Sequence, residues 1–165
     1  MMKKTFKKVS TTMCLLGLST AGLMSVDLAK AASDTAQALA VVTAAINISQ
    51  VADLDFGSSV QGDAASTVAP GDATAAEFAV TGQASTAYTI TLPADATVTM
   101  ITGGGATADE QIAVNSFAST PAAGANGLLD GTGAQTLKVG ATRAALSGTQ
   151  TAGSYAANFT VDVVY

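Results

Sequence analysis

Apolar and polar side chains alternate along the last thirteen residues of the chain, residues 153–165. A period of two places alternate side chains on opposite faces of a β-strand. The pattern therefore predicts a closing strand with one apolar face that packs in a core. That face carries Tyr155, Phe159, Val161, Val163 and Tyr165.

A second alternating pattern occupies residues 38–49, near the beginning of the chain. Alanine is a good helix former, but the β-branched valine, isoleucine and threonine residues of this stretch favour a strand. One face of this strand carries Ala40, Val42, Ala44, Ile46 and Ile48. The sequence allows two interpretations: the strand is the first strand of this domain, or it is donated to a neighbouring subunit.

Shorter strand patterns lie between these two segments, at residues 54–57, 78–82, 88–92, 98–100, 112–117 and 137–146. Loops rich in glycine, proline and aspartate separate them. We expect Leu128 and Leu129 to enter the core, and Gly140 is a candidate position for a β-bulge. Short strands with turn signals at regular spacing predict an all-β fold, an immunoglobulin-like antiparallel β-sandwich, formed as a single domain by residues 32–165.

A targeting segment precedes the predicted domain. Lysines at positions 3, 4, 7 and 8 precede an apolar stretch at residues 13–26, and Ala29-Lys30-Ala31 forms an A-x-A cleavage pattern. Spanning a bilayer takes about 20 apolar residues, whereas this stretch is shorter and is interrupted by serine and threonine. We therefore expect residues 1–31 to be a signal peptide that is cleaved after Ala31. The mature chain is expected in the periplasm, at the cell surface or outside the cell, with no insertion into a membrane.

Charge and cysteine content narrow the function classes once residues 1–31 are removed. Lys138 and Arg143 then remain against eleven acidic residues, so the formal charge falls from −5 to −9. Nucleic acids and anionic lipids bind to basic patches, so neither is an expected partner. Cys14 is the only cysteine and lies in the predicted signal peptide, so the mature chain can form no disulfide.

The residue types that carry most enzyme chemistry are scarce. The chain has no histidine, so acid–base chemistry would depend on carboxylates, tyrosines or Lys138. The adjacent Asp109 and Glu110 would point to opposite faces of a strand. Asp53 and Asp55 have no third ligand or proton donor at a useful spacing. We therefore expect no catalytic site, no cofactor and no enzyme activity.

Calcium is the one metal ion that the sequence leaves open, because it takes hard oxygen ligands and suits an extracellular site. Asp53, Asp55, Asp63 and Asp72 could converge in the fold, but they do not form a D-x-D-x-D-G loop. We interpret them as solvated loop carboxylates and expect no metal site. Nearly all aromatic side chains fall on apolar faces, so core packing explains them better than sugar binding.

The order of five motifs carries a resemblance to known proteins. The motifs are Leu54-Asp55-Phe56-Gly57, Phe78-Ala79-Val80-Thr81-Gly82, Tyr88-Thr89-Ile90-Thr91-Leu92, Leu137-Lys138-Val139-Gly140 and the closing segment from Gly153-Ser154-Tyr155 to Tyr165. Together they resemble a bacterial family of secreted domains of unknown function. More distantly, they resemble spore coat protein U and the archaic (Csu-type) chaperone–usher pilins. That resemblance implies an immunoglobulin-like sandwich that assembles by donating a strand between subunits.

Two features depart from the pilin pattern. Csu-like subunits usually carry cysteines, and the predicted mature chain has none. A fibre subunit normally has a donor segment in addition to its own first strand, whereas only one alternating segment fits between Ala31 and Leu54. The second departure puts polymerisation in question and leaves the fold prediction intact.

These observations predict an exported cell-surface or pilus-like structural subunit that is assembled by β-strand complementation. Its expected partners are like subunits or a periplasmic chaperone. The alternative is a self-contained periplasmic or secreted binding domain, for a surface polymer or another protein, that does not polymerise.

Overall fold

The computed structural model describes residues 32–165. The predicted signal peptide, residues 1–31, lies outside this part of the chain. Residues 32–39 are extended and exposed and belong to a first unit, Met1–Leu39, whereas Ala40–Tyr165 forms the second unit, the β-domain. No helix within residues 32–165 is long and apolar enough to cross a membrane.

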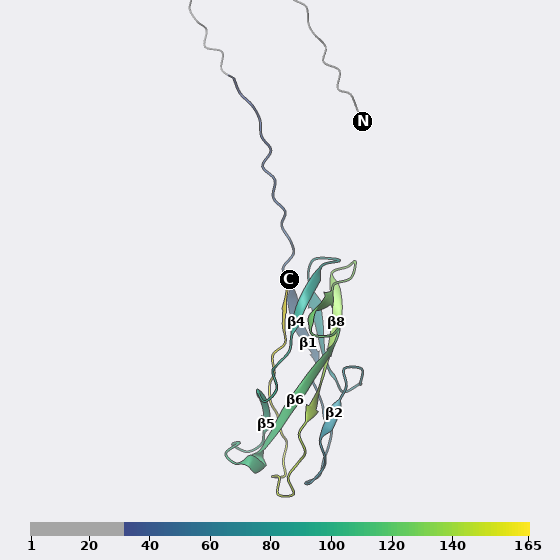
Figure 1. Cartoon of the computed structure of the whole chain (residues 1–165), viewed down its shortest axis with the longest axis vertical. Helices are drawn as coiled ribbons and strands as arrows, with labels where there is room; N and C mark the ends of the chain where they lie inside the picture. The colour runs from purple at the N-terminus through teal and green to yellow at the C-terminus, as the bar shows by residue number, and fades with distance from the viewer. Residues whose placement is uncertain (1–31) are drawn as a thin grey trace, which may run out of the picture. The chain divides into compact units, whose positions relative to one another are not determined.

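Two antiparallel sheets make up the β-domain (Figure 1). The larger sheet has the order β1-β3-β8-β6-β5, and β2 lies beside β8 beyond the end of β3. Its strands are β1 (Asn47–Ala52), β2 (Ser66–Val68), β3 (Ala76–Thr81), β5 (Val98–Ile101), β6 (Gln111–Thr120) and β8 (Ala134–Arg143). The smaller sheet has the order β7-β4-β9 and contains β4 (Ala87–Thr91), β7 (Gly124–Leu128) and β9 (Asp162–Val164). The prediction of an all-β antiparallel sandwich is confirmed, and a single 3₁₀ turn, η1 (Ala108–Glu110), is the only helical element of the described chain.

Strand β8 is the central element of the larger sheet. It pairs with β3 along its first part and with both β2 and β6 along its second part. Its alternating pattern buries Leu137, Val139 and Ala141, and the same face continues to the buried side chain of Arg143. Because side chains alternate along a strand, Arg143 lies on the same buried face as these three apolar residues.

Side chains from both sheets form the core. The largest fully buried side chains are Tyr88, Ile90, Leu129, Leu137, Val80 and Val139. Phe159 packs beside this cluster, with its ring centroid 5.3 Å from that of Phe117 and 6.2 Å from that of Phe78. In β4, Tyr88 and Ile90 are buried while Thr91 is exposed, as the alternating pattern predicts.

A glycine allows the Tyr88 ring to lie flat against the smaller sheet. Tyr88 pairs with Gly127 of β7, and a Cβ atom at Gly127 would lie only 2.5 Å from the ring. The Tyr88 hydroxyl donates a hydrogen bond to Oε1 of Gln135 in β8 (2.6 Å), and the amide of Leu128 donates to the same oxygen (3.1 Å). Burial raises the pKa of the Tyr88 hydroxyl. This network ties β4, β7 and β8 together.

Asp130 shapes the turn that leads into β8. Its Oδ1 accepts hydrogen bonds from the amides of Ala134 (3.0 Å) and Thr132 (2.8 Å) and from the Thr132 hydroxyl (2.7 Å). These bonds lower the pKa of the Asp130 carboxyl because they favour its charged form. The aspartate acts as the local anchor of the turn, as is common for Asp beside glycine.

Two positions near the core differ from expectation. Leu128 is 56% exposed, so only Leu129 enters the core; the two residues follow each other at the end of β7 and point in opposite directions. Gly140 is not itself the extra residue of a bulge: the register shifts in β6, between Asn115 and Ala118, and Ala118 pairs with Gly140. Glycine is needed at position 140 because a Cβ there would overlap the chain that leaves β2 at Ala69 and Pro70.

The closing strand is much shorter than the alternating pattern predicts. Only Asp162–Val164 forms β9, which pairs with β4. Farther upstream, Ala156 forms an isolated antiparallel bridge with Ile101 of β5, which belongs to the other sheet. The closing segment thus passes from the edge of one sheet to the edge of the other, and a segment that changes sheets cannot remain one regular strand.

Candidate strand-binding cleft

One side of the sandwich has a seam between the segment that follows β1 and the segment that precedes β9. The strand residues that line it, Met100, Ile112 and Arg143, all belong to the larger sheet. The edge strands β1 and β9 contact each other at one end of this seam. Beyond that contact, residues 53–61 and 157–161 belong to no strand. The two segments run in opposite directions, because residues 157–159 line a small pocket with Gln50 and Asp53, whereas residues 150–155 face residues 54–61. We call the space between residues 54–61 and 150–155 the seam cleft.

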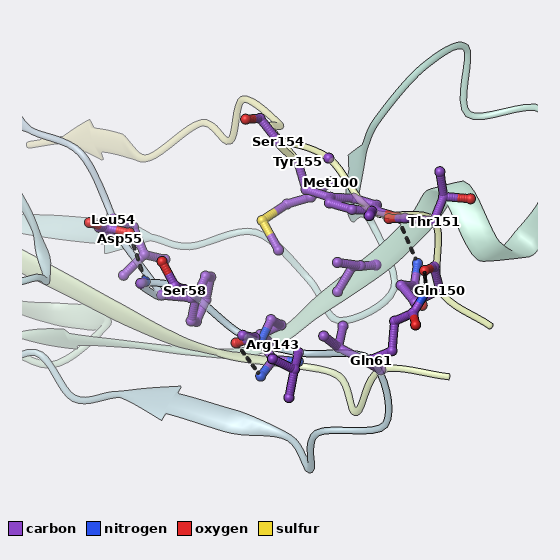
Figure 2. A pocket seen from close by; sticks show the side chains of 18 residues that line it. Leu54, Asp55, Ser58, Gln61, Met100, Arg143, Gln150, Thr151, Ser154 and Tyr155 are labelled. Carbon is purple, nitrogen blue, oxygen red and sulfur yellow. Dashed lines mark hydrogen bonds between the residues drawn. The ribbon is translucent and has the colours of Figure 1, made fainter. Parts of the chain in front are cut away.

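The seam cleft has a volume of about 670 Å³ (Figure 2). Figure 2 shows Met100 and Tyr155 on one side of the cleft and Arg143 and Gln61 on the other. Apolar side chains contribute much of its lining: Leu54, Phe56, Val60, Met100, Ile112 and Leu146. Of these, Val60 is 69% exposed, whereas Ile112 is buried in β6. The cleft therefore combines apolar and polar surface between two stretches of irregular backbone.

A hydrogen-bond network fixes the wall formed by residues 150–155. The buried side chain of Gln150 donates through Nε2 to the carbonyl oxygens of Asp109 (2.7 Å) and Gln111 (3.1 Å). The Tyr155 hydroxyl lies 2.6 Å from the Thr151 carbonyl oxygen and 2.8 Å from that of Asp109. A tyrosine whose hydroxyl bonds to backbone a few residues upstream is a recurrent corner in immunoglobulin-like sandwiches. This wall is therefore held without strand pairing.

Arg143 lies at the end of β8, across the cleft from Tyr155 (Figure 2), and is only 4% exposed. Its Nη1 donates to the Ala144 carbonyl oxygen (2.8 Å), and its Nη2 donates to Ser59 Oγ (3.1 Å) and the Ala64 carbonyl oxygen (3.2 Å). Its Nε is buried and has no hydrogen-bond partner within residues 32–165. The ion pair found in that part of the chain joins Lys138 to Glu77 (3.8 Å), and no carboxylate pairs with Arg143.

The carboxylates considered from the sequence serve local turns. Asp63 accepts the Val60 amide (2.8 Å), Asp72 accepts the Ala69 amide (2.7 Å), and Asp55 accepts the Gly57 amide (2.8 Å). Asp53 accepts a hydrogen bond from the side chain of Gln50. Among the described residues, no group of three His, Cys, Asp or Glu side chains could hold a metal ion.

Asp109 and Glu110 lie in η1 and not in a strand, so the expectation that they point to opposite faces of a strand does not apply. The Asp109 carboxylate accepts from Ser147 Oγ (2.9 Å), and that of Glu110 accepts from the Ala106 amide (2.7 Å). Both side chains thus stabilise the loop beside the wall formed by residues 150–155.

The structure divides the N-terminal alternating segment into two parts. Residues 47–52 form β1 and pair with β3, and Ile46 and Ile48 pack partly against the core. Residues 40–45, which we call the arm, lie outside any strand and are exposed. Val41 and Val42 are 95% and 91% exposed. Of the expected assembly face, Ala40, Val42 and Ala44 therefore belong to the arm, whereas Ile46 immediately precedes the domain's own first strand and Ile48 lies in it.

The residues predicted for the closing core strand are buried to different degrees. Val161 is buried, and Phe159 and Val163 pack partly against the core. Tyr155 is half-buried in the wall of the seam cleft, and Tyr165 is 47% exposed, with its hydroxyl accepting the Gln83 amide (2.5 Å). The expectation of a core position is therefore wrong for Tyr165.

Sequence reasoning did not identify Arg143 or Gln150 as cleft residues. A usable signal exists for Arg143, because it is in phase with Leu137, Val139 and Ala141 on the buried face of β8. For Gln150 we find no such signal, because it lies in a loop where no period links it to the core.

Comparison with known proteins gives the family and little else. Neither the curated proteins nor the solved structures yielded a match. A family model described as a domain of unknown function (DUF4402) matches residues 64–165, more than half of the chain. The match includes Arg143 and the wall formed by residues 150–155, and begins after the arm, β1 and the wall formed by residues 54–61. The chain therefore belongs to the DUF4402 family of domains of unknown function.

Proposed function

We propose that this protein is an exported, pilus-like structural subunit of the cell surface that assembles by β-strand complementation. The arm of one copy lies in the seam cleft of another. The observation that carries the proposal is that one domain has both an unpaired apolar segment, residues 40–45, and an open seam with irregular walls.

Burial of the arm provides the driving force. Fully burying a valine side chain is worth about 1.5–3 kcal/mol, and Val42 is 91% exposed in the single copy. On an extended arm, Ala40, Val42 and Ala44 share one face, which would lie on the apolar lining of the cleft. Val41 then points away from that lining.

Main-chain hydrogen bonds provide the second contribution to the free energy of assembly. An extended peptide that joins a sheet edge gains main-chain hydrogen bonds, and its alternate side chains fill pockets along the way. Residues 54–61 and 157–161 are outside strands. The amides of Asp55, Gly57 and Val60 are already bonded within the domain, so an inserted segment would pair with the remaining backbone groups of these two segments. The resemblance to Csu-type pilins, which exchange strands in this way, supports the same interpretation, and the predicted signal peptide supports export.

The division of the N-terminal segment removes an objection to this proposal. One alternating segment could hardly serve both as the first strand and as a donor. In the structure, β1 occupies only residues 47–52 and leaves residues 40–45 unpaired. A donor and a first strand can therefore both come from the same stretch of chain.

Light scattering of the purified exported protein tests the proposal through two matched variants. Val42→Asp places a charge on the face that enters the cleft and should abolish assembly. Val41→Asp changes the neighbouring valine, which is equally exposed but has the opposite orientation on an extended arm, and should weaken assembly far less. A wild-type protein that stays monomeric at high concentration would contradict the proposal, and so would equal effects of the two variants.

A self-contained secreted binding domain is the second candidate, and the size of the seam cleft is the observation that favours it. Small-molecule sites usually enclose about 300–1,000 Å³ and combine apolar surface with a few polar groups. The cleft, at about 670 Å³, falls in this range and contains Tyr155, Gln61 and Arg143. Monomeric protein that binds a surface glycan in calorimetry would favour this candidate over assembly.

A further inference from the structure

Arg143 is a buried cation with no anion in its own domain. Its side chain is only 4% exposed, and within residues 32–165 its hydrogen-bond acceptors are a hydroxyl and two carbonyl oxygens, all of them neutral. A guanidinium stays protonated in proteins, so burial cannot be relieved by loss of the proton. Such a charge is costly unless a partner compensates it, and an arriving carboxylate would gain strong, charge-assisted hydrogen bonds.

The position of Arg143 connects this charge with the proposed assembly site. Arg143 lines the seam cleft and contacts Ser59, which belongs to the wall formed by residues 54–61. Its Nε is the one buried side-chain polar atom of the described chain that lacks a hydrogen-bond partner. A ligand strand in the cleft would pass beside this group.

The N-terminal segment of a second copy offers a single candidate anion. Between residues 32 and 46, Asp34 is the only charged side chain. On an extended chain, Asp34 has the same parity as Ala40, Val42 and Ala44, so it lies on the face that enters the cleft. Its one hydrogen bond in the single copy is local, from the amide of Thr35 (2.8 Å).

The length of the donated segment and the length of the seam are compatible with a pairing of Asp34 with Arg143. A strand advances about 3.3 Å per residue, so Asp34 and Val42 are about 26 Å apart on an extended segment. The seam that runs from Gln50 to Gln61 spans at most about 36 Å, the length of a fully extended segment, and Ser59 lies near its far end. Asp34 can therefore reach Arg143 while Val42 still lies along the seam.

We propose that the Asp34 carboxylate of a second copy pairs with Arg143 and fixes the register of the donated segment. This inference rests on the proposed function and adds a specificity-determining pair to it. Apolar side chains at every second position would tolerate a shift of two residues, because each shift again presents small apolar groups to the cleft. A single buried ion pair excludes those shifted registers.

A double-mutant cycle in the full exported chain tests the pair. Asp34→Asn should weaken the dissociation constant of assembly, measured by sedimentation, by roughly tenfold to a hundredfold, as is typical of a hydrogen bond to a charged group. In an Arg143→Met background, whose folding is checked by circular dichroism, Asp34→Asn should change the constant by less than about twofold. Asp162→Asn removes the same charge from exposed β9 and serves as the control.

The outcomes separate this inference from the proposed function. If Asp34→Asn behaves like Asp162→Asn while Val42→Asp still abolishes assembly, the ion pair is wrong and strand complementation stands. If Asp34→Asn weakens assembly as much in the Arg143→Met background as in the wild-type background, Arg143 is not the partner of Asp34 and the inference is overturned. If the wild-type chain is monomeric, both proposals fail together.

Discussion

The two alternating segments at the ends of this chain have the same sequence pattern and different structural roles. The N-terminal segment divides into an exposed arm, residues 40–45, and β1, which pairs with β3. The C-terminal segment passes from a bridge with β5 to β9 beside β4, and its middle packs against the core at Phe159 and Val161. Alternation therefore shows that a segment can form a strand, and the available edges decide whether it does.

The two regions also differ in what holds them in place. Residues 150–161 are fixed by aromatic packing of Phe159 and by the hydrogen bonds of Tyr155 and Gln150. In the arm, the one hydrogen bond that the structure gives to residues 40–45 runs from the Ala44 amide to Gln83 Oε1 (3.3 Å). The C-terminal segment thus contributes to the domain's stability, whereas few contacts hold the arm.

Truncation tests this comparison with the largest expected effect. Removing residues 32–52 deletes β1 together with the packing of Ile46 and Ile48, and should abolish cooperative folding, because domain stability totals only about 5–15 kcal/mol. Removing residues 32–45 should change the free energy of unfolding of the monomer by less than about 0.5 kcal/mol. Urea denaturation followed by circular dichroism measures both. If removal of residues 32–45 strongly destabilised the domain, the arm would belong to the fold.

Phe159→Ala tests the packing of the C-terminal segment. The ring contacts Phe78 and Phe117 but is only partly buried, so we expect a loss of about 3 kcal/mol, the lower end for removing a core phenylalanine. Val42→Ala in the arm is the matched apolar truncation and should have almost no effect on monomer stability. Similar losses at both sites would contradict the distinction between the two segments.

A pair of tyrosine variants gives the smallest expected effect and compares the two ends of the closing segment. Tyr155→Phe removes a hydroxyl that lies within hydrogen-bonding distance of two carbonyl oxygens in a half-buried wall, and should cost about 1–1.5 kcal/mol. Tyr165→Phe removes a hydroxyl that accepts one amide from a side chain that is half-exposed, and should cost less than about 1 kcal/mol. Thermal denaturation compares them, and the reverse order would mean that the corner at Tyr155 does not hold the wall.

Local pattern was sufficient for the fold class and for much of the core. The alternation in β4 placed Tyr88 and Ile90 inside, and that in β8 placed Leu137 and Val139 inside. These predictions hold because side-chain direction in a strand depends only on the local period of two. Leu128 was misplaced because two adjacent leucines cannot both face the core from one strand.

The candidate site could be predicted only in part. The sequence indicated the alternating faces of residues 40–48 and of the closing segment, but it did not reveal the seam cleft. The cleft depends on how residues 54–61 and 150–155 are spaced, and these two segments are far apart in the chain. Arg143 was in phase with buried residues, yet nothing local shows that a cation at that position lacks an anion.

Periodicity and turn residues act over a few positions, so the sequence alone predicts a β-protein with alternating segments at both ends. Three features appear only in the folded domain: β1 begins at Asn47, the closing segment changes sheets at Ala156, and a cleft lies beside Arg143. Each of these features depends on which edges remain unpaired after the other strands have formed. That is a property of contacts distant in sequence, and no local pattern contains it.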